Sequence, residues 1–298
     1  MSLLGKSSTP TSSYIIIALI LGAVFYVLKN NKSKDSPAAK LHQIEQKLEQ
    51  NNIQPQDNTF LPTSTTGEIV AHSYYTLSYS EKDEQAEWVA YTLTRDMVSG
   101  FHNERNDNFR PDKSVPTGSA TPDDYRGSGY DRGHLCPASD MNSDVKAMDE
   151  TFFMSNMSPQ LHFCNCGVWR ELEESVKDWA KKYRKIYVIT GPILKGGSTK
   201  KIGQANKVTV PNAYYKVIMT AEGEQKAVAF IVPNESSEER LDKFLVSVDR
   251  VEEATGIDFF PKLLTPAQES KLEATVDLTA WQFNDKRYNT RITKWNKK

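Results

Sequence analysis

At 298 residues the chain is long enough for one large or two ordinary domains, and 38% apolar residues with 10% aromatics support a buried core and exclude a disordered chain. The formal net charge of −1 excludes a globally basic protein, so a nucleic-acid partner would have to meet local clusters of Lys and Arg. Three cysteines are too few for a disulfide scaffold, and their odd number leaves at least one thiol unpaired within the chain.

The first hydrophobic feature is an uncharged run at residues 14–28, which follows a polar tail at residues 1–13. The run is shorter than the roughly 20 residues of an ideal membrane-spanning helix and is close in length to the core of a signal peptide. It ends in bulky residues, and no small-x-small cleavage motif follows it directly. We therefore expect an uncleaved anchor helix, and a secreted protein if the segment is cleaved.

Residues 29–63 are polar and poor in aromatics, which predicts a linker. From residue 69 onward β-branched and aromatic residues become frequent, and the folded domain is assigned to residues 64–298. Alternating or apolar segments predict strands, and amphipathic spacing predicts helices at 168–184 and 238–255. The predicted strands are 72–79, 88–94, 185–190, 207–210, 214–219 and 226–232. Strand groups interrupted irregularly by helices favour an α+β fold.

Three dense blocks of functional residue types lie within fifty residues of one another: YRGSGYDRGHLCPA (125–138), MDETFFMSNMSPQ (148–160) and NCGVWRELE (165–173). The DRGH sequence, the SNMSPQ sequence and the Asn-x3-Trp-x3-Glu spacing resemble the DNA/RNA non-specific endonucleases, the ββα-metal nucleases that include endonuclease G. The resemblance extends from about residue 74 to 260. It implies a central antiparallel sheet that carries a ββα-metal (His-Me finger) active site.

The resemblance assigns the general base to His134. Cleavage of a phosphodiester requires a base that activates water, positive charge near the phosphate and an electrophile at the leaving oxygen. A neutral imidazole is well populated near pH 7, because the ordinary pKa of histidine is about 6.5. The residue type thus agrees with the role that the family implies.

The resemblance also makes Asn165 the metal ligand, and an amide oxygen suits a hard ion such as Mg²⁺. A helix N-cap is the structural alternative for this residue, because a helix is predicted to follow it. Glu173 matches the family's glutamate eight residues further on. On one helix it would lie within about 80° of Asn165 but about 12 Å away along the axis, so we expect it in the outer shell of the metal.

Basic residues near these blocks are candidates for binding phosphate. Arg132 lies within DRGH, where its guanidinium would bind a phosphate oxygen, with pairing to Asp131 or another carboxylate as the structural alternative. Arg105 and Arg110 lie upstream, and the sequence does not choose between them. Asn156 also fits the family pattern, as a structural hydrogen-bonding residue near the site.

The cysteines allow a rival interpretation, although buried small apolar side chains are the default for them. Cys136 follows His134 by two residues, and Cys164 and Cys166 flank Asn165, so one histidine and three thiolates are available for tetrahedral zinc. Spacing by two residues fits a single ion poorly, and buried thiols or a disulfide from Cys136 remain open. The alternative function is then a noncatalytic, membrane-anchored nucleic-acid-binding protein with structural zinc.

The resemblance implies a Mg²⁺-dependent endonuclease, with Mn²⁺ as a second ion, that hydrolyses DNA and RNA and leaves 5′-phosphate ends. A homodimer and an inhibitor protein are left open as partners, besides the membrane at residues 14–28. Lys29, Lys32 and Lys34 outnumber Lys6, which by the positive-inside rule favours a cytoplasmic domain. A broad nuclease would attack the cell's own nucleic acids, so we expect the domain outside the cytoplasmic membrane.

Overall fold

The computed structural model describes residues 58–196, 199–274 and 277–297, all within one compact unit that begins at Asp57. In these three ranges, none of the helices has the length and apolarity needed to cross a membrane. The expected anchor at residues 14–28 and the expected linker up to residue 57 lie outside the described residues.

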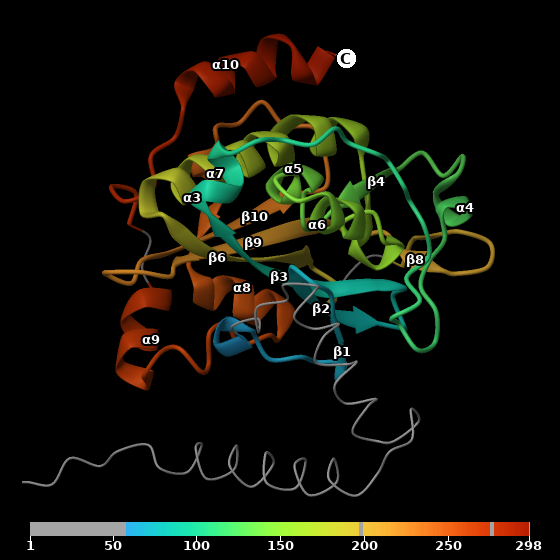
Figure 1. Cartoon of the computed structure of the whole chain (residues 1–298), viewed down its shortest axis with the longest axis horizontal. Coiled ribbons are helices and arrows are strands. Elements are labelled where there is room, and N and C mark those ends of the chain that lie inside the picture. Colours follow the sequence, from blue (N-terminus) through green and yellow to red (C-terminus); the bar gives the residue numbers. More distant parts are fainter. Residues whose placement is uncertain (1–57, 197–198, 275–276, 298) are drawn as a thin grey trace, which may run out of the picture. The chain divides into compact units, whose positions relative to one another are not determined.

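An antiparallel seven-stranded sheet organises the domain, in the order β1-β2-β3-β6-β9-β10-β11 (Figure 1). Its strands are β1 (Glu68–Ala71), β2 (Tyr75–Ser80), β3 (Gln85–Thr94), β6 (Lys185–Pro192), β9 (Ala213–Thr220), β10 (Ala227–Pro233) and β11 (Leu245–Val246). Two smaller ribbons pair β4 (Asp131–His134) with β5 (Met157–Gln160) and β7 (Lys201–Ile202) with β8 (Val208–Thr209). Helices around a central antiparallel sheet confirm the predicted α+β fold.

Helices cover both faces of the sheet, with α7 over one face and α8 and α9 over the other (Figure 1). The α-helices are α3 (Arg95–Ser99), α4 (Pro122–Tyr125), α5 (Ala138–Met141), α6 (Val145–Glu150), α7 (Arg170–Tyr183), α8 (Val248–Thr255), α9 (Pro266–Glu273) and α10 (Asp285–Thr293). Short 3-10 turns are η1 (Asn58–Phe60), η2 (Met154–Asn156), η4 (Leu241–Phe244) and η5 (Trp295–Lys297), and η3 (Cys164–Trp169) is a π-helical turn.

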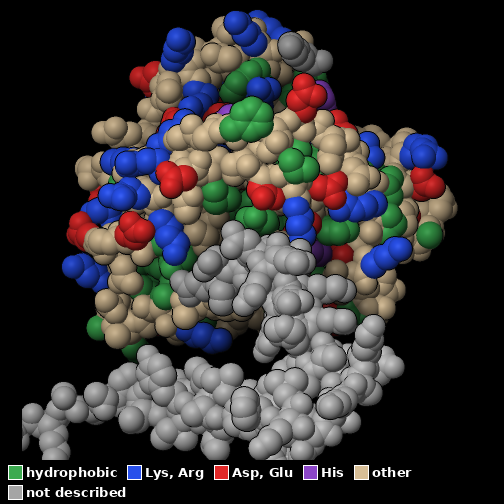
Figure 2. Space-filling model, in the orientation of Figure 1, with side chains coloured by type: hydrophobic (Ala, Val, Ile, Leu, Met, Phe, Trp, Pro, Cys, Tyr) green, Lys and Arg blue, Asp and Glu red, His purple; other side chains and the backbone are tan. Residues whose placement is uncertain are grey.

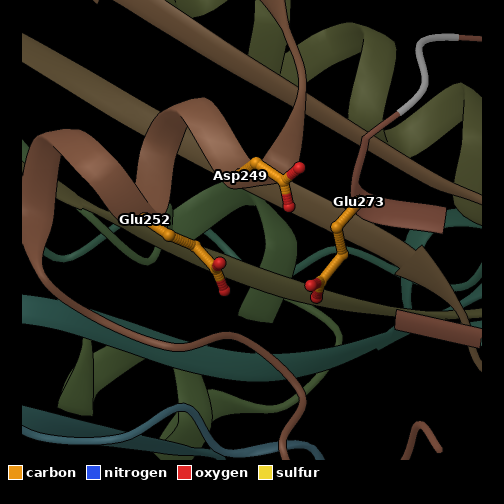
Figure 3. Close-up of side chains that lie close together, drawn as sticks. All are labelled: Asp249, Glu252 and Glu273. Atoms are coloured by element: carbon orange, nitrogen blue, oxygen red, sulfur yellow. The ribbon is translucent and has the colours of Figure 1, made fainter. Parts of the chain in front are cut away.

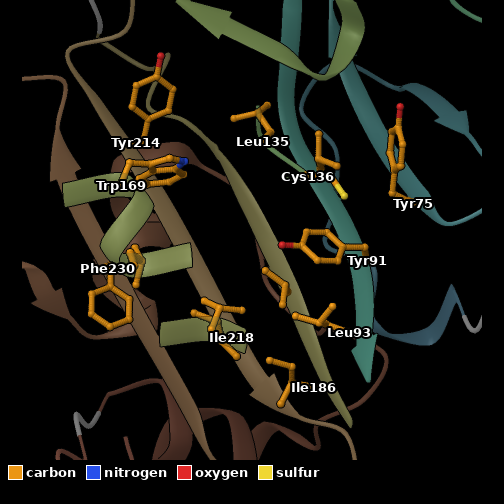
Figure 4. Close-up of a cluster of buried hydrophobic side chains, with 14 of the residues drawn as sticks. Tyr75, Tyr91, Leu93, Leu135, Cys136, Trp169, Ile186, Tyr214, Ile218 and Phe230 are labelled. Carbon is orange, nitrogen blue, oxygen red and sulfur yellow. The ribbon is translucent and has the colours of Figure 1, made fainter. Parts of the chain in front are cut away.

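Each face of the sheet has its own hydrophobic core. The core beneath α7 includes Tyr91, Trp169 and Ile218 (Figure 4). The core beneath α8 includes Trp88, Tyr215 and further residues of the same strands. Successive side chains of a strand point to opposite faces, so the continuous apolar strands of this sheet supply both cores at once.

The sequence predicted the central strands, but the helix expected at 238–255 is wrong in its first half. There the chain forms η4 and β11, whose Leu245 pairs with Phe230 at the sheet edge. Helix α8 starts only after Ser247, whose hydroxyl accepts a hydrogen bond from the Arg250 amide, and it ends at Gly256 in the left-handed conformation. A serine N-cap and a glycine after the last turn define these ends physically.

The compact domain also reaches further towards the N-terminus than the expected boundary at residue 64. Phe60 is buried and stacks on Tyr187, with 4.4 Å between the ring centroids. The Trp88 indole nitrogen donates to the Thr63 carbonyl oxygen at 2.9 Å. Residues 58–63 therefore pack as part of the domain.

Candidate active site

The DRGH block forms the whole of strand β4, which pairs antiparallel with β5. Its glycine is required by close packing, since a Cβ atom at Gly133 would lie 2.1 Å from Oε1 of the buried Gln160. Arg132 and His134 are two residues apart and so project from one face of the strand. The chain then continues from β5 through η3 into α7, which gives a ββα arrangement.

Asn156 fixes the backbone that follows His134. Its side-chain oxygen accepts from the Cys136 amide at 2.8 Å, and its amide group donates to the carbonyl oxygens of Cys136 and Thr151. The residue is fully buried, so each of these bonds would be costly to lose. Asn156 is thus a structural hydrogen-bonding residue next to the histidine.

His134 lies in an aromatic setting. Its ring centroid is 5.1 Å from that of Phe152, edge to face, and 5.7 Å from that of Phe109. Burial, together with the positive charges of Arg105 and Arg132, lowers the pKa of His134 to about 3. Its Nε2 atom is shielded from solvent and has no hydrogen-bond partner among the described residues. The imidazole is therefore held in its neutral form, and the same burial and positive charges that keep it neutral also lower its basicity.

Two of the three candidate arginines lie at this histidine. The guanidinium of Arg132 stacks on Phe109, 4.1 Å from the ring centroid, and that of Arg105 lies 5.0 Å from the Phe152 centroid. Arg132 forms no salt bridge with Asp131 in the described structure, so the structural alternative for it is not observed. The same two aromatic rings thus contact both cations and the histidine.

Arg110 is engaged elsewhere. It pairs with Asp149 at 2.6 Å, donates to the Asp149 carbonyl oxygen and lies 4.1 Å from the Phe153 ring centroid. These bonds connect the loop before β4 to the end of α6. Arg105 is paired too, with Asp107 at 2.6 Å, but its guanidinium lies over Phe152 and its charge lowers the pKa of His134, so Arg105 is the second cation near this histidine.

Asn165 lies on η3, and its side chain turns towards β4. Its amide nitrogen donates to Asp131 Oδ2 at 3.0 Å, and the same oxygen lies 2.8 Å from His162 Nδ1. The N-cap alternative is not observed, because Phe163 precedes the π-helical turn and Trp169 precedes α7. This hydrogen bond to Asp131 fixes the orientation of the Asn165 side-chain amide, including its oxygen. Sequence reasoning gave Asp131 and His162 no role of their own.

A recess of about 620 Å³ lies next to Phe109, one of the rings that contact His134, and His134 itself is not among the residues that line it. Its walls contain both cations and the amide, since it is lined by Arg105, Asp107, Phe109, Pro122, Tyr125, Arg126, Tyr130, Asp131, Arg132 and Asn165. Outside it, Figure 2 shows acidic and basic side chains mixed over the face in view. On the face in view, the basic side chains therefore do not form one continuous basic surface.

Glu173 does not line this recess. Burial raises its pKa, Lys216 and Lys177 lower it, and Asp140 raises it, so Glu173 belongs to a charged cluster beneath α7. Burial likewise raises the pKa of Asp140 to about 6, and the Tyr91 hydroxyl donates to this carboxylate at 2.9 Å. An outer-shell metal role for Glu173 stays a prediction.

The cysteines are not assembled into a zinc site. All three are free thiols: Cys136 and Cys164 are buried in the core beneath α7, and the Cys166 thiol donates to the Trp295 carbonyl oxygen. Among the described residues, the only group of three His, Cys, Asp or Glu side chains placed to hold an ion lies elsewhere, between α8 and α9. Burial as small apolar side chains is the interpretation that the structure supports for Cys136 and Cys164.

Comparison with known proteins agrees with this geometry. The sequence profile of the DNA/RNA non-specific endonucleases matches residues 55–265. Nuclease C1 of Cunninghamella echinulata var. echinulata is 37% identical over 215 residues, covering 67% of this chain and 85% of the relative. Human mitochondrial endonuclease G is 35% identical over 218 residues, covering 68% and 73%.

A solved structure shares the fold as well. The crystal structure of the EndoG/EndoGI complex contains a chain that is 34% identical, with a TM-score of 0.61, over 67% of this chain and 88% of that one. The β4-β5-α7 arrangement and these matches define a nuclease that hydrolyses phosphodiesters. The chain belongs to the DNA/RNA non-specific endonuclease family, and it is similar to endonuclease G.

Proposed function

We propose that this nuclease cuts DNA and RNA with His134 as general base and a divalent metal ion held by Asn165. The observation that carries the proposal is the neutral His134, which lies against Phe109 and Phe152 beside two cations of the recess. Those cations belong to Arg105 and Arg132, which line the recess together with Asn165. Base, positive charge and oxygen ligand are the three requirements of phosphodiester hydrolysis.

The residues present fit a divalent ion, which members of this family use. The Asn165 amide nitrogen is bonded to Asp131, so the amide oxygen is the atom left to bind a cation. The Asp131 carboxylate also lines the recess and adds a second hard oxygen donor. Few protein oxygens and room for water are typical of Mg²⁺, which we propose as the ion, with Mn²⁺ as a substitute.

The chain's own residues then have separate tasks. His134 accepts the proton of the attacking water through its imidazole, which is unprotonated at neutral pH. Arg105 and Arg132 bind the nonbridging oxygens and stabilise charge that grows on phosphorus. A divalent ion held by Asn165 would supply Lewis acidity that stabilises the negative charge of the reacting phosphate. Cleavage of the bond between phosphorus and the 3′ oxygen leaves 5′-phosphate ends. Because these groups contact phosphate and not base edges, DNA and RNA are both substrates.

The proposal is tested by digesting supercoiled plasmid and single-stranded RNA with the purified full-length chain, with Mg²⁺ and with EDTA. Asn165→Ala should lose activity at low Mg²⁺ and regain part of it as Mg²⁺ is raised, because ligation is weakened. Asn284→Ala, which removes an asparagine from the N-cap of α10, is the matched control and should cut normally. A folded Asn165→Ala protein with wild-type activity at every Mg²⁺ concentration would contradict the metal-ligand role.

We further propose that residues 14–28 anchor the protein and that residues 29–57 tether the nuclease domain outside the cytoplasmic membrane. The support is the apolar run itself and the damage that a free nuclease would cause in the cytoplasm. Protease added to intact spheroplasts should release a soluble, active fragment. Protection of the domain until the membrane is lysed would reverse this topology.

A further inference from the structure

On the face of the sheet away from α7, three carboxylates from two helices approach one another. Asp249 and Glu252 are three residues apart on α8 and so share one side of that helix, and Glu273 is the last residue of α9 (Figure 3). One carboxylate oxygen from each residue lies within 4.8 Å of the other two. In Figure 3 all three side chains point into one gap between the helices.

Glu273 differs from an ordinary surface carboxylate because it is buried. The residue is 2% exposed, and its Oε1 atom is shielded from solvent with no hydrogen-bond partner among the described residues. A buried carboxylate oxygen without a partner is costly, and its place at the end of α9 adds the negative end of a helix dipole. Glu273 thus has one buried oxygen without a hydrogen-bond partner among the described residues, and its carboxyl group lies beside those of Asp249 and Glu252.

The neighbouring charges do not supply that partner. Burial raises the pKa of Glu273 to about 8, and Glu252, Glu269, Asp249 and Asp258 raise it in the same direction. Of the two Glu252 oxygens, Oε1 accepts from the Phe259 amide at 2.8 Å, which leaves the other oxygen for a ligand. Asp249 is exposed and gives an entry path from solvent.

We propose that Asp249, Glu252 and Glu273 bind one calcium ion that fastens α9 to α8. Calcium binds carboxylate oxygens at about 2.3–2.6 Å, so ligands on opposite sides of one ion are up to about 5 Å apart. Magnesium requires near-octahedral geometry, whereas calcium accepts irregular arrangements of oxygen ligands. Three carboxylates from two helices, with one oxygen of each within 4.8 Å of the others, therefore favour calcium, and water fills the remaining positions. This inference does not depend on the proposed catalytic mechanism.

Because the cluster is remote from Asn165, calcium binding to it can be measured in a protein whose proposed catalytic metal ligand has been removed. Full-length Asn165→Ala protein, stripped with EGTA, should bind one calcium ion per chain in equilibrium dialysis. With only three protein side chains we expect a Kd of about 10⁻⁴ to 10⁻³ M. At 10 mM calcium the thermal midpoint of the domain should rise by about 3–10 °C, and magnesium should raise it less.

Glu273→Gln, made in the Asn165→Ala protein, should lose this response while its midpoint in EGTA stays close to that of the parent, because the amide replaces a carboxyl group whose raised pKa keeps it mostly protonated near neutral pH. Glu253→Gln is the matched control: it lies on α8, pairs with Arg250 outside the cluster and should keep the full calcium shift. If Glu273→Gln fails to fold, Asp249→Asn at the exposed ligand replaces it in the test. Its Kd for calcium should then be at least about tenfold weaker than that of the parent. A parent protein unaffected by calcium, an equal shift with magnesium, or a Glu273→Gln protein with an undiminished shift would overturn the proposal.

Discussion

The two faces of the central sheet are made by the same strands but differ in the buried charged side chains that they contain. On β9, Tyr214, Lys216 and Ile218 face α7, whereas Tyr215 and Val217 face α8. Lys216 is fully buried, 4.8 Å from the Trp169 ring centroid, and its charge opposes those of Asp140 and Glu173. The α7 face therefore contains buried charges of both signs.

A buried salt bridge on the α7 face links the C-terminal helix α10 to α7. Arg291 of α10 is fully buried and binds Glu171 of α7 at 2.5 Å. The core beneath α8 is apolar instead, and the acidic side chains Asp249, Glu252 and Glu273 gather at the α8–α9 contact. Buried side chains of both signs thus lie on the α7 face, although Lys216 Nζ itself makes no hydrogen bond there among the described residues, whereas the side chains gathered at the α8–α9 contact are all acidic.

The largest expected effect on stability comes from removing the cation of the α7 face. Lys216→Met leaves buried carboxylates without their nearest compensating charge, which should lower the free energy of unfolding by about 3–5 kcal/mol. Urea denaturation measures this, with the exposed Lys262→Met as control, expected within about 0.5 kcal/mol of wild type. If the two variants are equally stable, the charges beneath α7 are not coupled as described.

On the α8 face, the stability of the domain should depend on how well the apolar core is packed. Val251→Ala on α8 removes two fully buried methyl groups, so we expect a loss of about 1.5–3 kcal/mol in the free energy of unfolding. Its kcat/KM on DNA should stay at the wild-type value, because the recess lies on the other side of the sheet. A clear fall in kcat/KM with a normal fold would show that the two faces are functionally linked.

Replacing a thiol on the α7 face should have a smaller effect. Cys164 donates to the Pro233 carbonyl oxygen, and a serine hydroxyl can make the same bond, so Cys164→Ser should cost about 1 kcal/mol and keep its activity. Metal analysis of protein purified without chelator should find no stoichiometric zinc. One zinc per chain, lost together with the fold in this variant, would restore the zinc interpretation.

The smallest expected effect is on the acid side of the pH profile. The pKa of His134 is lowered to about 3, so the histidine stays unprotonated in the free enzyme as pH falls from 8 to 5. Since kcat/KM reports groups of the free enzyme, it should show no fall due to His134 in this range at saturating Mg²⁺. His162→Ala serves as control for the second histidine near the recess. A tenfold fall in both proteins, centred near pH 6.5, would mean that His134 has an ordinary pKa.

Much of the site was predictable because its residues lie in short blocks. DRGH forms one strand, and Asn165 begins the segment that leads into α7, so the sequence places His134, Arg132 and Asn165 near one another. The central strands were predictable for a similar reason, because each is one continuous segment of the sequence that is rich in β-branched and aromatic residues. The end of the expected helix at 238–255 was correct, because Gly256 gives a clear stop, and its start was wrong, because Leu245 and Val246 satisfy a strand as well as a helix.

The rest depends on contacts between distant residues. The choice of Arg105 over Arg110 follows from how the long loop before β4 folds against Asp149 and Phe152, which no spacing rule predicts. Glu273 approaches α8 only through the packing of α9, more than twenty residues from Glu252 in sequence. Burial of such groups is a property of the folded domain, so their pKa values and ion-binding capacity are invisible in the sequence.

The central claim, that His134 is the base of this nuclease, is tested most directly by the rate at which His134→Ala cleaves plasmid DNA at saturating Mg²⁺. The account predicts a loss of about 10²- to 10⁴-fold in kcat, the range typical of a general base. DNA binding and the urea midpoint should remain close to wild type, and the exposed His102→Ala should cut normally. A His134→Ala protein that turns over at the wild-type rate would contradict the mechanism.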